Sequence, residues 1–123
     1  MLYNNAEIEG MLQSLPEYLE RKDVIGYAAA RNARILQTEL TEFEQKRDAL
    51  IMEYGEQDTD EQGNYVGYRV NPESDTFANF VEALNELAQI ELDVDIFKIP
   101  YEEAIGKLSG IELLKIDWMF EDR

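Results

Sequence analysis

The sequence predicts a mostly helical α+β fold, in which a long antiparallel helix pair is accompanied by a small two-stranded β element and short flanking helices. Three observations predict it: a long apolar stripe with helical spacing, a shorter stripe of the same kind, and two short segments with strand-like composition. With 123 residues, of which 45% are hydrophobic, the chain is long enough to form a single domain over residues 1–123.

The long helix is predicted from residues spaced alternately four and three apart, which places them on one helical face. These residues are Ala29, Ala33, Leu36, Leu40, Phe43, Arg47, Leu50 and Tyr54. We expect the helix to begin between Gly26 and Ala28 and to end at Tyr54, with Gly55 available as the C-terminal residue in the left-handed αL conformation. A helix of roughly 27 residues is about 40 Å long.

A shorter helix should precede it, because Ile8, Met11 and Leu15 have helical spacing, and Pro16 marks a break or the first turn of a new segment. The alanine-rich start of the long helix needs a cover, since the partner helix expected later in the chain spans only about 24 Å. The N-terminal helix is the preferred cover. The alternative is a second subunit, which would make the protein a homodimer.

After Gly55 we expect an acidic hairpin tip. Residues 56–64 are polar and end in Gln62, Gly63 and Asn64, which have turn composition, and Tyr65–Val70 reads as a short strand. The next helix should cover residues 75–90, with Asp75 or Ser74 as its cap, and should lie antiparallel to the long helix.

Residues 91–96 alternate between acidic and apolar side chains, which predicts a strand with one buried face and one row of carboxylates in solvent. Tyr65–Val70 is the expected partner of this strand. Residues 101–108 are expected to form a helical turn or two.

At the C-terminus, Ser109 and Glu112 fit a capping box that opens a last helix through Phe120. Trp118, in this helix, is expected to lie in the core.

The charge of the chain is distributed unevenly. Its net charge is −16, and the stretch from Glu53 to Glu103 contains fourteen Asp or Glu residues but only Arg69 and Lys98 as bases. Such a surface repels DNA, RNA and anionic membranes and favours cationic patches on other proteins. The alternative is that the acidity only keeps the protein soluble.

The chain contains neither Cys nor His. This composition excludes disulfides and thiolate chemistry, and it removes the commonest general base near neutral pH and the commonest transition-metal ligand. We therefore predict no catalytic residue, no metal site and no cofactor. The first ten residues lack the features of a signal peptide, and no stretch reaches the roughly 18 apolar residues of a membrane span, so we expect a soluble, cytoplasmic protein with no membrane partner.

Two acidic patterns resemble metal sites but fail on spacing. Residues 58–64 imitate the start of an EF-hand loop, but Arg69 occupies the position of its bidentate carboxylate. Asp93, Asp95 and Lys98 resemble the acid and lysine cluster of metal-dependent nucleases with the wrong spacing. An acidic hairpin tip and an exposed strand face are the preferred interpretations.

Arg31 and Arg34 lie three residues apart on the long helix and share a face with Tyr27. They form a candidate site for a small anion or nucleotide. The alternative, which we favour, is that both arginines pair with carboxylates of this chain.

Arg47 interrupts the apolar stripe of the long helix. We expect its stem to pass along the neighbouring apolar side chains and its guanidinium to meet a carboxylate such as Glu82 or Glu86.

Three stretches, EFEQKRDALIMEYGEQDTDEQGNYV, FANFVEALNELAQIELDVDIFKI and SGIELLKIDWMFED, resemble a family of small phage and prophage proteins of unassigned function. The resemblance spans roughly Tyr27 to Asp122 and consists of an order of elements with few fixed polar residues. It transfers no catalytic or binding residue. It implies a viral or mobile-element protein that acts in the cytoplasm of a bacterial host cell.

The leading hypothesis is a non-enzymatic inhibitor or modulator that mimics nucleic acid and docks on the basic surface of a nucleic-acid-binding protein. The expected partner-binding residues are Glu56, Asp58, Asp60, Glu61, Glu91, Asp93 and Asp95. One alternative is a structural or assembly accessory protein of the virion, and another is a protein that sequesters a small anionic nucleotide signal at Arg31 and Arg34.

Overall fold

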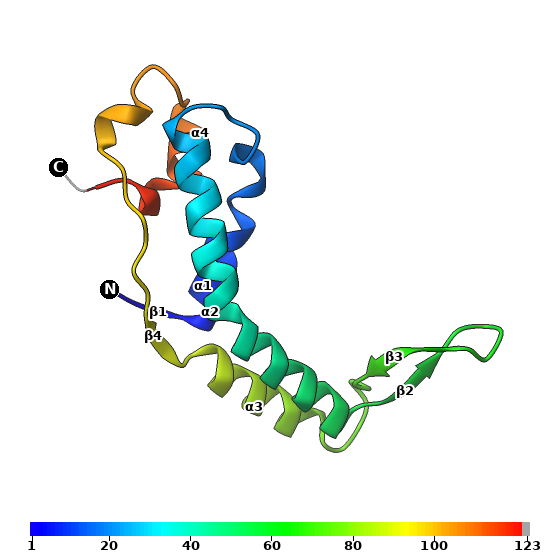
Figure 1. Cartoon of the computed structure of the whole chain (residues 1–123). Coiled ribbons are helices and arrows are strands. Elements are labelled where there is room, and N and C mark those ends of the chain that lie inside the picture. Colours follow the sequence, from blue (N-terminus) through cyan, green and yellow to red (C-terminus); the bar gives the residue numbers. More distant parts are fainter. Residues whose placement is uncertain (122–123) are drawn as a thin grey trace. The chain divides into compact units, whose positions relative to one another are not determined.

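A computed structural model describes residues 1–121 of the chain (Figure 1). The elements are, in chain order, β1 (Leu2–Asn4), α1 (Asn5–Gln13), η1 (Pro16–Tyr18), α2 (Val24–Tyr54), β2 (Glu56–Thr59), β3 (Tyr65–Arg69), α3 (Phe77–Ala88), β4 (Glu91–Asp93), η2 (Tyr101–Ala104), α4 (Gly110–Lys115) and η3 (Asp117–Met119), where η denotes a short 3₁₀ helix. The predicted fold class, mostly helical α+β, is confirmed. None of the helices in residues 1–121 is long and apolar enough to cross a membrane.

The chain divides into two compact units. Unit 1 contains Met1–Leu40 and the segment from Glu91 onward, and unit 2 contains Thr41–Ile90. The helix α2 contributes its first part to unit 1 and its last part to unit 2. A single domain over the whole chain stays a prediction.

Unit 1 has an extensive apolar core. Its side chains that are at most 2% exposed come from α1, η1, α2, the segment after β4 and the C-terminal elements, and they are Ile8, Leu15, Tyr18, Ile25, Ala28, Ala29, Leu36, Leu40, Val94, Ile99, Ile116 and Met119. Ala28 and Ala29, at the alanine-rich start of α2, are completely buried by residues of the same chain, whereas Ala33 is half-buried and Ala30 is exposed.

The two strands of unit 1 correct one prediction. We expected residues 91–96 to pair with Tyr65–Val70, but β4 pairs antiparallel with β1, with Tyr3 opposite Leu92. The strand β1 has only three residues, which is too short for an alternating pattern to be recognised in the sequence.

The start of α2 is fixed by Asp23, whose carboxylate accepts the backbone N–H of Gly26 at 3.2 Å. The helix therefore begins at Val24, two residues before the earliest start that we expected. A Cβ at position 26 would overlap the backbone carbonyl oxygen of Arg21, so glycine is required here by close approach. The predicted end of α2 at Tyr54 is confirmed, but the expected left-handed conformation of Gly55 is wrong, because Gly55 does not have a positive φ.

At the C-terminal end, the predicted capping box of Ser109 and Glu112 is confirmed: the Ser109 hydroxyl accepts the N–H of Glu112, and the Glu112 carboxylate accepts the N–H of Ser109. The last helix is shorter than expected. It ends at Lys115, because Ile116 has a φ of −130° and leaves the helical region, and η3 follows. Trp118 is half-buried, so its placement in the core is only partly correct.

Unit 2 consists of the last part of α2, the β2–β3 hairpin and α3, which runs antiparallel beside that part of α2 (Figure 1). Glu56–Thr59, which we expected in a turn, is a strand paired antiparallel with β3. The helix α3 covers residues 77–88, and its N-cap is Thr76 without a side-chain hydrogen bond, so the expected capping by Asp75 or Ser74 is wrong.

Unit 2 has a small core. Among residues 41–90, all of which are described, only Phe43 and Phe80 are buried, with exposed fractions of 6% and 9%. The rings of Tyr54 and Phe80 lie 6.0 Å apart and connect α2 with α3.

Candidate protein-binding surface

The β2–β3 hairpin presents two different faces. Side chains alternate along a strand, so Glu56 and Asp58 lie on one face of β2, and Gln57 and Thr59 lie on the other. Glu56 is opposite Arg69 in the ladder, but within this fully described hairpin their charged groups do not form an ion pair. The first face of the hairpin therefore contains two carboxylates, and Arg69 is its one cationic side chain.

The opposite face of the hairpin is aromatic. Tyr68 is the ladder partner of Gln57 and Tyr65 is the partner of Thr59, because a β-bulge at Asp58 and Thr59 skips Val66. The two tyrosine rings meet edge to face with centroids 6.1 Å apart. Tyr65 remains 60% exposed and Val66 58% exposed, so the hairpin offers aromatic and apolar surface beside its carboxylates.

The turn of the hairpin is organised by Asp60. Its carboxylate accepts the backbone N–H groups of Gln62 and Asn64, each at 2.9 Å, and Gly63 adopts a φ of 83°. These hydrogen bonds, led by that from Asn64, lower the pKa of Asp60. Asp60 therefore shapes the turn, while Glu61 beside it is exposed to solvent.

A groove runs between α2 and α3 in unit 2. It has a volume of about 550 Å³, and its lining residues are Lys46, Ala49, Leu50, Glu53, Ala83, Glu86, Leu87 and Ile90. The apolar side chains of this set form most of the lining, and Ile90 is 51% exposed. Glu53, Glu86 and Lys46 supply the charges of the lining.

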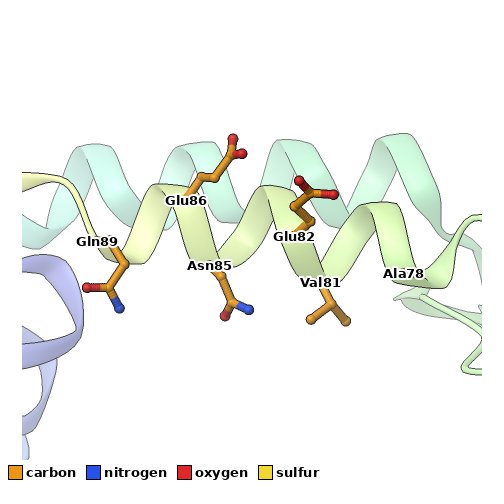
Figure 2. Close-up of a pocket in the computed structure, with 6 residues that line it drawn as sticks. All are labelled: Ala78, Val81, Glu82, Asn85, Glu86 and Gln89. Carbon is orange, nitrogen blue, oxygen red and sulfur yellow. The ribbon is translucent and has the colours of Figure 1, made fainter.

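A second, shallow concavity of about 460 Å³ follows the outer surface of α3 (Figure 2). Glu82 and Glu86 project to one side of the helix, and Val81, Asn85 and Gln89 project to the other. We expected the Arg47 guanidinium to meet Glu82 or Glu86. That prediction is wrong, because both glutamates belong to this exposed surface and Arg47 contacts another carboxylate. The Nε atom of Arg47 lies 3.7 Å from Asp48 Oδ1, and its guanidinium lies 5.8 Å from the Phe43 ring centroid.

The seven acidic residues expected to bind a partner fall in both units. Glu56, Asp58, Asp60 and Glu61 lie together in the hairpin of unit 2, whereas the other three belong to the β4 segment of unit 1. The predicted alternation in that segment is confirmed, because its three carboxylates are exposed and Val94 is buried. These three residues are Glu91, Asp93 and Asp95, and the Asp93 carboxylate lies 3.0 Å from the amino group of Met1.

Charge pairing differs between the units. Unit 1 contains ion pairs between Arg21 and Asp23 at 2.6 Å, Lys107 and Glu103 at 2.9 Å, and Lys115 and Glu17 at 3.1 Å. Unit 2 contains twelve acidic and three basic residues, and its only ion pair in the described structure is the one between Arg47 and Asp48. Most carboxylates of unit 2 therefore form no ion pair within the unit.

Arg31 and Arg34 do not make the ion pairs that we favoured. In the described part of the chain no carboxylate oxygen lies within 4.0 Å of either guanidinium. The Arg31 guanidinium instead lies over the rings of Phe97 and Tyr27.

The sequence patterns that resemble metal sites receive no support from the side-chain arrangement. Within residues 1–121, no group of three or more acidic side chains converges in a way that could hold a metal ion. The Asp60 carboxylate, which the EF-hand comparison would assign to a cation, accepts backbone N–H groups of its own turn.

The meeting of Tyr65 and Tyr68 on one face of the hairpin was not recognised in the sequence. Tyr65 and Tyr68 are three residues apart, which would place them on opposite faces of a regular strand. Gly67, with a φ of 126°, lies in the bulge that brings them to one face. A glycine inside a strand pattern is the signal that could have indicated this bulge.

Comparisons of the chain with protein families, with curated proteins and with solved structures find no match.

Proposed function

We propose that the protein is a non-enzymatic binding protein whose unit 2 docks on a basic surface of a nucleic-acid-binding protein. The observation that carries the proposal is the surplus of unpaired carboxylates on unit 2, a net charge of −9 over 50 residues, beside exposed aromatic surface. Charge of one sign on a small surface steers association with a partner of the opposite sign and discriminates against acidic surfaces.

The hairpin supplies the charged part of the proposed contact. Within the described residues, Glu56, Asp58 and Glu61 are not engaged in ion pairs, and the turn that carries Glu61 is held by the hydrogen bonds of Asp60. Carboxylates presented on a pre-organised hairpin lose little conformational freedom on binding. Duplex DNA carries one negative charge per about 1.7 Å of helix axis, and a cluster of carboxylates on a small surface imitates such a field.

The tyrosine face and the α2–α3 groove supply the apolar part. Tyrosine is enriched among the residues that contribute most to binding energy, because it combines a large contact area with few rotatable bonds. The groove between Leu50 and Leu87 accepts an apolar side chain, and Glu53 and Glu86 in its lining complement a basic neighbour of that side chain. The partner surface should therefore combine lysine or arginine residues with at least one exposed apolar residue.

The test uses two variants with the same change in net charge. The hairpin variant carries Glu56→Gln, Asp58→Asn and Glu61→Gln, and it retains Asp60 because that carboxylate closes the turn. The control variant carries Glu20→Gln, Asp117→Asn and Glu121→Gln, three exposed acids of unit 1.

Each protein is immobilised and incubated with a bacterial lysate that has been treated with nuclease. We expect the wild type and the control variant to retain the same basic nucleic-acid-binding protein, and the hairpin variant to lose it. Raising the salt concentration from about 50 to about 500 mM should release the bound protein, because exposed charges are screened over a few ångströms at the higher value. Retention by all three proteins, or retention independent of salt, would refute the proposal.

Light scattering on the purified protein tests the competing use of the groove. A monomer would agree with a groove that is open to a partner. A stable dimer that dissociates in the Leu87→Glu variant would instead show that the groove serves self-association, and this would favour an assembly role.

A further inference from the structure

One exposed face of unit 1 is cationic, although the chain as a whole is strongly acidic. On this face of α2 lies a cavity of about 430 Å³ lined by Tyr27, Ala30, Arg31, Arg34 and Ile35. Its volume lies within the range of about 300 to 1,000 Å³ that is typical of small-molecule sites. Two guanidinium groups and one phenol supply its polar atoms.

The guanidinium of Arg31 is held in place from two directions. It lies 4.6 Å from the centroid of the Phe97 ring and 5.8 Å from that of Tyr27, and its Nη1 donates a hydrogen bond to the Tyr27 hydroxyl at 3.2 Å. The two rings meet edge to face at 5.9 Å. Cation–π contacts restrict the orientation of the planar group and leave N–H groups at its edge for a ligand.

The position of Phe97 is itself fixed by a buried side chain of α2. Asn32 is completely buried, its Nδ2 donates to the carbonyl oxygen of Phe97 at 2.9 Å, and its Oδ1 accepts the N–H of Phe97 at 2.8 Å. This pair of hydrogen bonds joins the segment after β4 to α2. The ring that supports Arg31 is thus part of the rigid frame of unit 1.

The charges of Arg31 and Arg34 are not compensated in the described structure. Arg21, Lys107 and Lys115 of the same unit each pair with a carboxylate, but no carboxylate of residues 1–121 lies within 4.0 Å of Arg31 or Arg34. Lys22 and Lys98 of unit 1 also form no ion pair within the described residues, but Arg31 and Arg34 are neighbours that line the same cavity. The local positive charge is available to an external anion.

We propose that this cavity binds the phosphoryl group of a small molecule. A guanidinium presents parallel N–H groups that match phosphoryl oxygens, and two of them three residues apart on a helix reach the same group. The exposed ring of Tyr27, at 56%, offers an aromatic surface beside the phosphoryl position. This site lies wholly in unit 1, so the proposal does not depend on the function proposed for unit 2.

The experiment is a calorimetric titration of the full chain with inorganic pyrophosphate and, separately, with AMP. Arg34→Gln removes one of the two charges from a side chain that is exposed and makes no ion pair within the described residues, so we expect the variant to fold. Lys22→Gln is the matched control, because it removes one exposed positive charge of unit 1 outside the cavity. Circular dichroism checks that both variants remain folded.

We expect the wild type to bind at least one of the two probes. Arg34→Gln should weaken that binding about tenfold, which corresponds to one lost charge-assisted contact. Lys22→Gln should change it less than about twofold. Tighter binding of AMP than of pyrophosphate would identify a nucleotide ligand that also contacts Tyr27, and the reverse order would identify a site for the phosphoryl group alone.

Two results would overturn the proposal. One is the absence of binding of both probes up to about 10 mM, the range in which even weak sites become occupied. The other is an equal loss of binding in Arg34→Gln and Lys22→Gln, because this would reflect the general charge of the protein.

Discussion

The two units of the chain differ in how they use their residues. Unit 1 buries a large set of apolar side chains and pairs several of its charges, whereas unit 2, described over its whole length, buries only Phe43 and Phe80 and contains a single, long ion pair. One helix, α2, contributes to both units with the same apolar spacing. The difference teaches that folding explains the composition of unit 1, while the acids and the exposed Tyr65 of unit 2 need another explanation.

The largest expected effect is on the free energy of unfolding. It is found by replacing two leucines of α2, one in each unit, and comparing the losses. Leu36 is completely buried in unit 1, and its replacement by alanine should lower the free energy of unfolding by about 3 to 4 kcal/mol. Leu50 is half-buried in unit 2, and its replacement should cost only about 1 kcal/mol. Urea unfolding followed by circular dichroism measures both values. Equal losses would show that the two units are equally well packed and would remove the contrast.

The next prediction concerns the stability of unit 1 and compares two of its glycines, Gly26 and Gly10. Gly26→Ala should destabilise the protein by about 2 to 3 kcal/mol, because the new Cβ overlaps the backbone of Arg21. A Cβ added at Gly10, in α1, would point into open space, and Gly10→Ala should stabilise the helix by about 0.5 to 1 kcal/mol. Thermal unfolding measures whether each variant is less or more stable than the wild type. A neutral Gly26→Ala variant would show that the turn before α2 is loosely packed.

A smaller effect concerns the ion pair at the start of α2. The hydrogen bond from Arg21, followed by that from the Gly26 N–H, lowers the pKa of Asp23. Because the folded-state pKa lies below the ordinary value of about 4, the carboxylate stabilises the fold above that pH. The contribution is lost as the pH falls through the lowered pKa.

Asp23→Asn should therefore cost about 1 kcal/mol at neutral pH and progressively less below about pH 4. Unfolding measured at several pH values tests this dependence, with Glu20→Gln as a variant of equal charge change. A constant difference between Asp23→Asn and the wild type down to about pH 2 would contradict the assigned role of Asp23.

The sequence predicted the parts of the fold that depend on local signals. The spacing of the α2 stripe and the capping box at Ser109 and Glu112 both depend on residues a few positions apart, and both are confirmed. The strand pairing was wrong, because β1 is very short and β2 is polar on both faces, so neither has an alternating pattern. Long-range pairing depends on which segments meet in space.

The candidate surface was predictable only in part. The acidic residues of the hairpin could be counted in the sequence, but their lack of ion pairs within unit 2 depends on the positions of Lys46, Arg47 and Arg69 in three dimensions. The meeting of Tyr65 and Tyr68 depends on the bulge in β3. The same spacing along α2 also gives no indication that residues 41–54 are less buried than residues 24–40, because burial depends on the elements that cover the helix.

The most direct test of the contrast neutralises three carboxylates in each unit and compares the free energies of unfolding at neutral pH and low ionic strength. The hairpin variant carries Glu56→Gln, Asp58→Asn and Glu61→Gln, and the unit 1 variant carries Glu17→Gln, Asp23→Asn and Glu103→Gln, three acids with cationic partners. We predict that the hairpin variant is as stable as the wild type or more stable, because like charges are removed, and that the unit 1 variant is less stable. A hairpin variant that is clearly less stable than the wild type would show that these carboxylates hold the fold together, and would contradict their availability to a partner.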